Sequence, residues 1–199
     1  MVFMRAMPRI QISLAGGLGP PQSREPLITL DCHAASPAPG GVQASAAFTG
    51  EGALALRYRI DAAGYRPRIP EAAAPERVEG LWRHTCCEVF VLGEDAPAYR
   101  EFNFSPSGAW QAYAFAAYRQ GGPLARAAAP RIARQDDGAF SLSVLLPAAN
   151  LPPGRRLRLG LSAVIEDAAG GLSYWALRHP PGQPDFHHPD GFVLELERP

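Results

Sequence analysis

Apolar and polar residues alternate along most of the chain, which is the pattern of β-strands with one buried face. The clearest examples are residues 53–60 (ALALRYRI) and 156–167 (RLRLGLSAVIED). In the first, Leu54 and Leu56 share one face and Arg57 lies on the other. Further strands are predicted over residues 84–92, 99–105, 109–119, 139–147, 172–179 and 191–197, with weaker ones near 10–14, 27–30 and 42–48.

No segment sustains the 3.6-residue period of a long helix, and proline or glycine occurs in nearly every gap between the strands. Residues 71–77 (EAAAPER) predict at most one helical turn, which Pro75 ends. Many short strands without intervening helices predict an all-β, antiparallel sandwich or barrel. We find neither an internal repeat nor a linker, so residues 1–199 are expected to form a single domain.

The composition is that of a soluble globular protein, with 47% hydrophobic and 19% charged residues. The net charge is zero, so no electrostatic footprint for nucleic acid or for an anionic membrane is present. The chain has no apolar stretch of signal-peptide or transmembrane length, and we expect a cytoplasmic protein. Cys32, Cys86 and Cys87 are expected to be reduced thiols. The oligomeric state is not indicated.

Residues 81–91 (LWRHTCCEVFV) combine an aromatic ring, an imidazole and a carboxyl group at every second position. An extended chain would point Trp82, His84 and Glu88 to one side, and the valines to the other. In the next predicted strand, Glu101 and Asn103 likewise oppose phenylalanines.

These residue types suit carbohydrate recognition. Sugar rings stack their apolar faces on indole or phenol rings, while their hydroxyl groups bond to carboxylate, amide and guanidinium groups. The residues that supply this chemistry are Trp82, Glu88, Asn103, Trp175 and Arg178. For each tryptophan, packing in the core of a sandwich is an equally good interpretation.

Glu88 and Glu101 also form a candidate catalytic pair, because their strands are predicted to make a hairpin. If their carboxyl groups lie about 5–10 Å apart, they could act as acid and base in glycoside hydrolysis. The alternative is that both are solvated residues on an antiparallel sheet. The sequence has no G-x-S-x-G elbow and no phosphate-binding glycine loop.

Metal and haem sites have weaker support. His84, Glu88 and His187 could hold one metal ion, but no ligand spacing demands it. The methionines all lie at the amino terminus, outside the predicted strands, which disfavours Met/His ligation of haem. We therefore predict neither a metal nor a cofactor.

The carboxyl-terminal segment LSYWALRHPPGQPDFHHPDGF (172–192) concentrates polar and aromatic side chains between two strands. Its functional candidates are Trp175, Arg178, His179, Asp185, His187 and His188. Such a loop is a typical location for a binding site. It could equally be a self-packed loop that closes one end of the sandwich.

Three blocks resemble the DOMON-like ligand-binding superfamily, in its uncharacterised bacterial branch: LWRHTCCEVFV, YREFNFSPSGAWQAYAFAAYR and YWALRHPPGQPDFHHPDGF. The pattern is more distantly similar to carbohydrate-binding module family nine, a β-sandwich in which two tryptophans clamp a sugar and a glutamate accepts its hydroxyl groups. The resemblance implies that Trp82 is the first tryptophan and Glu88 the glutamate, with Trp175 as a second wall. No Asp-rich loop matches the calcium site of that family, so calcium is not carried over.

The resulting prediction is an antiparallel β-sandwich that binds a carbohydrate or a similar small polar ligand without catalysis. Trp82 would stack on the ligand, Glu88 would accept hydrogen bonds, and His84 would flank them. The remaining lining is predicted to come from Glu101, Asn103, Trp175, Arg178, His179 and His187. The alternatives are a hydrolase using Glu88 and Glu101, or His84 and His187 with a metal, and a structural or protein-interaction module.

Overall fold

Twelve strands and three short 3₁₀ helices form the described part of the computed structural model, which covers residues 26–199 except 62–63, 65, 95–96 and 137–138. The strands are β1 (Ile28–Cys32), β2 (Gly41–Phe48), β3 (Leu54–Asp61), β4 (Cys86–Gly93), β5 (Tyr99–Phe104), β6 (Trp110–Ala117), β7 (Gln120–Pro123), β8 (Arg131–Asp136), β9 (Phe140–Leu146), β10 (Arg156–Glu166), β11 (Leu172–Ala176) and β12 (Leu194–Glu197). The 3₁₀ helices are η1 (Leu81–Arg83), η2 (Ala148–Asn150) and η3 (Pro189–Gly191). None of the helices in these residues is long and apolar enough to cross a membrane.

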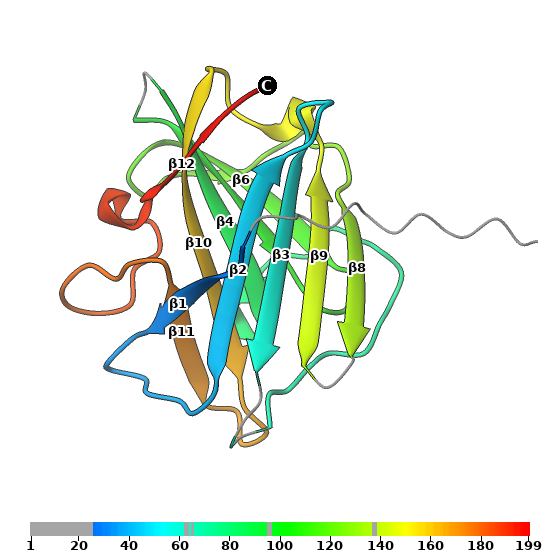
Figure 1. Ribbon diagram of the computed structural model, residues 1–199, viewed down its shortest axis with the longest axis vertical. Coiled ribbons are helices and arrows are strands. Elements are labelled where there is room, and N and C mark those ends of the chain that lie inside the picture. The colour runs from blue at the N-terminus through cyan, green and yellow to red at the C-terminus, as the bar shows by residue number, and fades with distance from the viewer. Residues whose placement is uncertain (1–25, 62–63, 65, 95–96, 137–138) are drawn as a thin grey trace, which may run out of the picture.

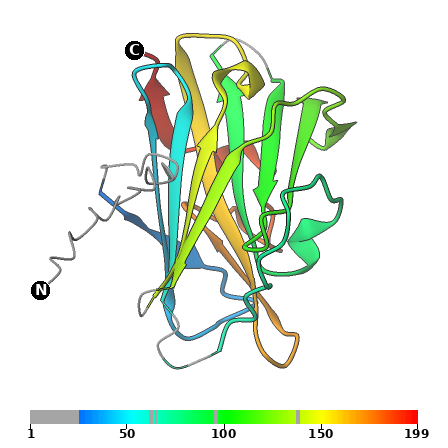
Figure 2. The same ribbon diagram turned by 90° about the vertical axis from the view of Figure 1, so that its right-hand side faces the viewer.

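The strands form two antiparallel layers packed face to face, so the predicted β-sandwich is confirmed (Figure 1). Sheet A has the order β1-β2-β3-β9-β8, and it faces the viewer in Figure 1. Sheet B has the order β7-β6-β5-β4-β10-β11, and β12 pairs with the first half of β10 beside β11. Figure 2 shows the two layers edge-on.

Strand β1 joins the two sheets along one edge. Its residues 28–30 pair with β2 in sheet A, whereas Asp31 and Cys32 pair with Ala176 and Trp175 in β11 of sheet B. The sandwich is therefore closed at this edge, and within the described residues the path of paired strands ends at β7 and β8.

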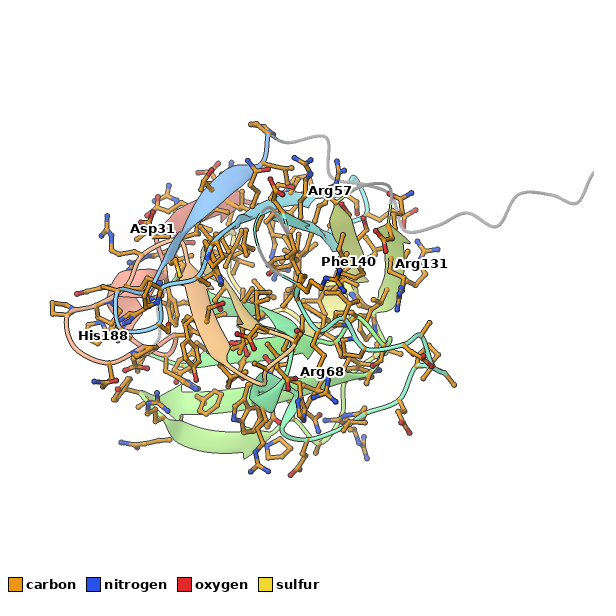
Figure 3. All side chains as sticks on the ribbon, turned by 90° about the horizontal axis from the view of Figure 1, so that it is seen from below. Asp31, Arg57, Arg68, Arg131, Phe140 and His188 are labelled. Carbon is orange, nitrogen blue, oxygen red and sulfur yellow. The ribbon has the colours of Figure 1, made fainter. Side chains whose placement is uncertain are left out.

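The hydrophobic core lies between the sheets and consists of alternate residues of each strand. In β3, Leu54 and Leu56 are fully buried, as the pattern of residues 53–60 predicts. In β4, the core residues are Cys87, Val89 and Val91. Figure 3, seen from below, shows side chains filling the space between the layers. The even-numbered residues of β4 consequently point away from the core.

The structure contains two strands that hydrophobic alternation does not predict. Strand β7 has the sequence QGGP, and β8, RIARQD, is largely exposed at the end of sheet A. Such strands pair through their backbone and bury few side chains, so they carry little periodic signal. The strand predicted near 10–14 lies outside the described residues. The helical turn predicted over 71–77 is wrong, since this segment is irregular apart from a bridge between Arg77 and Trp110.

The turn between β6 and β7 holds the two strands unusually close. A Cβ atom added to Gly121 would lie 2.0 Å from the carbonyl oxygen of Ala114 and 2.7 Å from Cα of Phe115, whereas one added to Gly122 would meet nothing within 4 Å. We expect Gly121→Ala to displace β7 and to lower the free energy of unfolding by about 1–3 kcal/mol.

The matched variant Gly122→Ala is expected to change stability by less than about 0.5 kcal/mol. Urea denaturation followed by circular dichroism compares the two variants. Equal midpoints would contradict the close approach of β7 to β6.

Candidate ligand-binding site

A cavity of about 610 Å³ opens on the outer face of sheet B, on the side opposite the core. We call it the sheet B cavity. It is lined by Trp82, Arg83, Glu88, Phe90, Glu101, Tyr113, Phe115, Arg119, Gly121, Gly122, Val164, Leu172, Tyr174, Pro184, Phe186 and His187. The floor comes from neighbouring strands β4, β5, β6, β10 and β11, whose outward-facing residues the two-residue period brings together. The walls come from η1, the turn after β6 and the loop before η3.

The floor contains two buried carboxyl groups. In the pairing of β4 with β5, Glu88 lies opposite Asn103, and Phe90 lies opposite Glu101. The glutamates are therefore diagonal neighbours on one face, a relation that typically separates Cβ atoms by about 7 Å. Glu88 is 2% exposed and Glu101 is 5% exposed. Nδ2 of Asn103 donates a 2.8 Å hydrogen bond to Oε1 of Glu101 and fixes that carboxyl group.

Burial and mutual repulsion keep this pair from ionising fully at neutral pH. Burial raises the pKa of Glu88 well above its ordinary value, and the charge of Glu101 raises it further. Burial also raises the pKa of Glu101 to about 7, although the Asn103 hydrogen bond and the Arg119 charge both lower it. Near pH 7, Glu101 therefore gains and loses a proton, and the same environment favours the protonated form of Glu88.

His187 forms the wall beside Glu101. Its Nδ1 lies 2.9 Å from the Tyr99 hydroxyl, which itself accepts a hydrogen bond from the backbone N–H of Arg119. Burial, followed by the charge of Arg119, lowers the pKa of His187 to about 4, so the ring is neutral at pH 7. We infer that Tyr99 donates to Nδ1, which leaves the ring proton on Nε2, 3.7 Å from Oε2 of Glu101.

Aromatic packing and an ion pair fix the loop that carries His187. The imidazole ring lies 5.1 Å from the Phe90 ring and 5.0 Å from the Phe115 ring, between centroids. Nη2 of Arg119 lies 2.7 Å from Oδ1 of Asp185, and the Tyr118 hydroxyl donates to the other oxygen of Asp185. These contacts connect the loop before η3 to the turn after β6, so the wall is held from two sides.

Trp82 forms the opposite wall from a tight turn rather than from a strand. Gly80 adopts a left-handed backbone with φ 76°, and η1 follows it directly. The indole is 41% exposed and packs edge-on against Tyr113, with 6.0 Å between ring centroids. Beyond the turn, Nδ1 of His84 lies 2.8 Å from Oε2 of Glu166. This contact anchors the chain between η1 and β4.

The structure brings together several of the predicted site residues. Trp82, Glu88, Glu101 and His187 line the sheet B cavity, and Asn103 lies directly beneath it through its bond to Glu101. The positions of Trp82 and His84 differ from the extended arrangement that the sequence predicts. Strand β4 begins at Cys86, so Trp82 reaches the cavity from η1, and His84 points to Glu166 instead of flanking Glu88.

The prediction that Trp175 forms a wall of the binding site is wrong. Trp175 is 4% exposed, belongs to the hydrophobic core, and donates from Nε1 to the Ser173 hydroxyl at 2.9 Å. It pairs with Ala163, another core residue, and so it faces the interior of the sandwich. Its neighbour Tyr174 has the opposite orientation and lines the cavity. The predicted clamp of Trp82 and Trp175 is therefore absent.

Arg178 and His179 are predicted to line the same site as Glu88, but neither lines the sheet B cavity. Both line a separate depression beside β1, where Nε2 of His179 is 2.8 Å from the carbonyl oxygen of Asp31, and its ring lies edge-on to His33. Arg178 also borders a small recess behind Phe90 and Phe186. The loop leaves β11 on the side of β1 before it returns to the cavity at Pro184. Sequence proximity to Trp175 does not reveal this path.

The predicted metal trio of His84, Glu88 and His187 is not assembled, because His84 lies outside the cavity. Within the described ranges, no group of three His, Cys, Asp or Glu side chains is arranged to hold a metal ion. The cysteines in these ranges are free thiols, with Cys86 and Cys87 both buried.

Sequence reasoning missed much of the aromatic lining, namely Phe90, Tyr113, Phe115, Tyr174 and Phe186. Tyr113 and Phe115 share a face in the sequence pattern, but nothing in that pattern shows that this face adjoins Glu101. The pairing of Glu101 with Tyr113 supplies the connection.

The ionisation of Glu101 is expected to lower stability as the pH rises from about 4.5 to about 7. A carboxyl group with a higher pKa in the folded state binds more protons when folded, so the free energy of unfolding decreases between its unfolded and folded pKa values. For Glu101 these values are 4.5 and about 7. The pKa of His187 is lowered from 6.5 to about 4, so this residue has the opposite sign and offsets one carboxyl group below pH 6.5.

Urea denaturation at pH 4.5, 5.5, 6.5 and 7.5 tests this sign. Relative to the wild type, Glu101→Gln is expected to lose less stability over the window, by on the order of 3 kcal/mol. Glu51→Gln, at an exposed turn between β2 and β3, is the control and should follow the wild type. Parallel curves for all three proteins would show that Glu101 ionises normally.

Comparison with family models and with curated proteins gives no sequence match. Two solved structures share the fold. One is a proposed carbohydrate-binding protein from Bacteroides uniformis, with 16% identity and a TM-score of 0.62, covering 86% of this chain and 85% of that one. The other is a family nine carbohydrate-binding module from Caldicellulosiruptor kristjanssonii in complex with cellotriose, with 9% identity and a TM-score of 0.57, covering 86% of this chain and 81% of that one.

The chain thus has a β-sandwich like that of carbohydrate-binding modules. At these identities the likeness establishes the fold, while the ligand has to be argued from the site. The resemblance to the DOMON-like superfamily stays a prediction.

Proposed function

We propose that the protein is a non-catalytic carbohydrate-binding module and that its sugar binds in the sheet B cavity. The observation that carries the proposal is the combination of aromatic walls with buried hydrogen-bonding groups on a floor of paired strands. The volume of the sheet B cavity, about 610 Å³, lies within the range of small-molecule sites, roughly 300–1,000 Å³.

The arrangement matches the two surfaces of a sugar ring. The apolar face of the ring would stack on Trp82, which is exposed at the wall. Its hydroxyl groups would reach Glu88 and Glu101 on the floor, where a protonated carboxyl group donates and an ionised one accepts. The rigid strands under this floor hold those groups in place before the ligand arrives, which lowers the cost of binding. Fold likeness to a module crystallised with cellotriose supports the same ligand class.

Glycoside hydrolysis is the second candidate, because two neighbouring carboxyl groups with raised pKa values are suited to acid–base work. Against it, Asn103 ties up one oxygen of Glu101. Hydrolysis requires turnover of 4-nitrophenyl glycosides that is lost in Glu88→Gln. A binding module gives no turnover with either protein.

Isothermal titration calorimetry with glucose, galactose, mannose, xylose and their common disaccharides tests the proposal. We expect saturable binding of one sugar per chain for at least one member of the series. Protection of the Trp82 indole from acrylamide quenching by the same sugar would locate the site. A series without binding heat or thermal stabilisation would contradict carbohydrate recognition.

A further inference from the structure

Among the described residues, no arginine is paired with the two carboxyl groups on the floor of the sheet B cavity. Within the described residues, the oxygens of Glu88 and Glu101 make no hydrogen bond or ion pair with an arginine; the nearest basic group is His187, at 3.7 Å from Glu101. A buried carboxylate is normally paired with a cation because an isolated charge is costly away from water. Here a proton takes that position.

The positively charged side chains at the rim of the cavity do not pair with the two carboxyl groups. The guanidinium of Arg119 is paired with Asp185 at 2.7 Å, and its side chain is 51% exposed. Arg83 lines the cavity from η1 and is also exposed. His187 faces the pair as a neutral ring. The other groups close to the pair are also uncharged: Asn103, Tyr113, the hydroxyl of Ser162 opposite Glu88, and the buried thiol of Cys86.

The aromatic lining of the cavity has the chemistry that attracts an organic cation. The rings of Trp82 and Phe186 line the walls, and those of Tyr113, Phe115 and Tyr174 line the floor around the carboxyl groups. The negative faces of aromatic rings stabilise an ammonium group within about 6 Å, most strongly where water is excluded. A bare divalent cation would instead require several more oxygen ligands than two carboxyl groups supply.

We propose that the ligand of the sheet B cavity is an amino sugar, whose ammonium group lies between the carboxyl groups of Glu88 and Glu101 and among the aromatic rings of the cavity. This inference rests on the proposed function, and it specifies the class of sugar. The ring of the sugar would still stack on Trp82, while the charged nitrogen distinguishes it from glucose-type ligands.

Binding of the cation displaces a proton. The ligand enters as R–NH₃⁺, the carboxyl pair becomes more ionised, and the released H⁺ passes to the buffer. Because ionised Glu101 is the form that binds, affinity is expected to rise as the pH increases from about 5.5 to about 7. A neutral sugar has no charge to replace the proton and is expected to show a weaker dependence.

Titration calorimetry with three β-1,4-linked disaccharides isolates the charge. The glucosamine disaccharide carries ammonium groups, cellobiose has hydroxyl groups at the same positions, and N,N′-diacetylchitobiose has neutral acetamides. At pH 7 we expect the glucosamine disaccharide to bind at least about tenfold more tightly than the other two. Titrations in phosphate and in Tris should differ in heat by the number of protons released multiplied by the difference between the ionisation enthalpies of the two buffers.

Glu101→Gln is expected to reduce this preference to less than about twofold, whereas the control Glu51→Gln keeps it. If Glu101→Gln does not fold, the proton release of the wild type remains an independent readout. Tighter or equal binding of cellobiose would overturn the amino-sugar inference and leave the proposed function standing. Binding of none of the three disaccharides, or of any sugar in the wider series, would overturn both.

Discussion

Trp175→Ala is expected to lower the free energy of unfolding by about 3–5 kcal/mol, the cost of removing a large aromatic side chain from a packed core. Trp175 lies in the core cluster at 4% exposure, and its pairing partner Ala163 is fully buried. The change leaves a cavity between the sheets and removes the hydrogen bond to Ser173. Urea denaturation followed by far-ultraviolet circular dichroism measures the loss without depending on tryptophan fluorescence.

Trp82→Ala is the matched control for this stability measurement, since the same side chain is removed from a position that is 41% exposed. Its cost is expected to stay below about 1 kcal/mol. If Trp175→Ala instead kept wild-type stability while abolishing sugar binding, Trp175 would belong to the site after all.

In contrast to its small effect on stability, Trp82→Ala is expected to have a large effect on sugar affinity. Trp82→Ala should weaken the best-bound sugar about tenfold or more, because an exposed indole that stacks on a ligand is a typical centre of binding energy. Titration calorimetry at matched protein concentrations measures the change. Ile28→Ala serves as the control, since Ile28 is an apolar residue of β1 with a similar exposure of 39% and lies outside the cavity.

Unchanged affinity in Trp82→Ala would place the ligand away from the sheet B cavity. Weakened binding in both Trp82→Ala and Ile28→Ala would indicate a general loss of folded protein, which the circular dichroism spectra would also reveal.

The fold could largely be predicted from the sequence because a two-residue period has few interpretations. The alternation in the second half of β3 and in the first residues of β10 distinguishes a buried face from an exposed one without knowledge of the neighbouring strands. The two-residue period also places Glu88 on one face of its strand and Glu101 on one face of the next strand. Because the two strands form a hairpin, these faces become one continuous surface. Strands that lack this signal, such as β7, become visible only through their backbone pairing.

The site could be predicted only in part, because parity does not say which face is the core. In β11, Tyr174 and Trp175 are adjacent aromatic residues, and either could face the cavity. The register with β10 decides between them, and this contact is set by the whole sheet. The composition of the carboxyl-terminal segment predicts Arg178 and His179 in the site, but it does not show that the loop first runs toward β1.

The two strands that end the path of pairing also bear on how copies of the chain meet. An unpaired strand edge is a template on which a second molecule can add its own strand and begin an aggregate. Strand β8 carries Arg131, Arg134 and Asp136, and the short strand β7 ends at Pro123. The charges on β8 and the missing backbone N–H at Pro123 of β7 both oppose the addition of a strand from a second molecule.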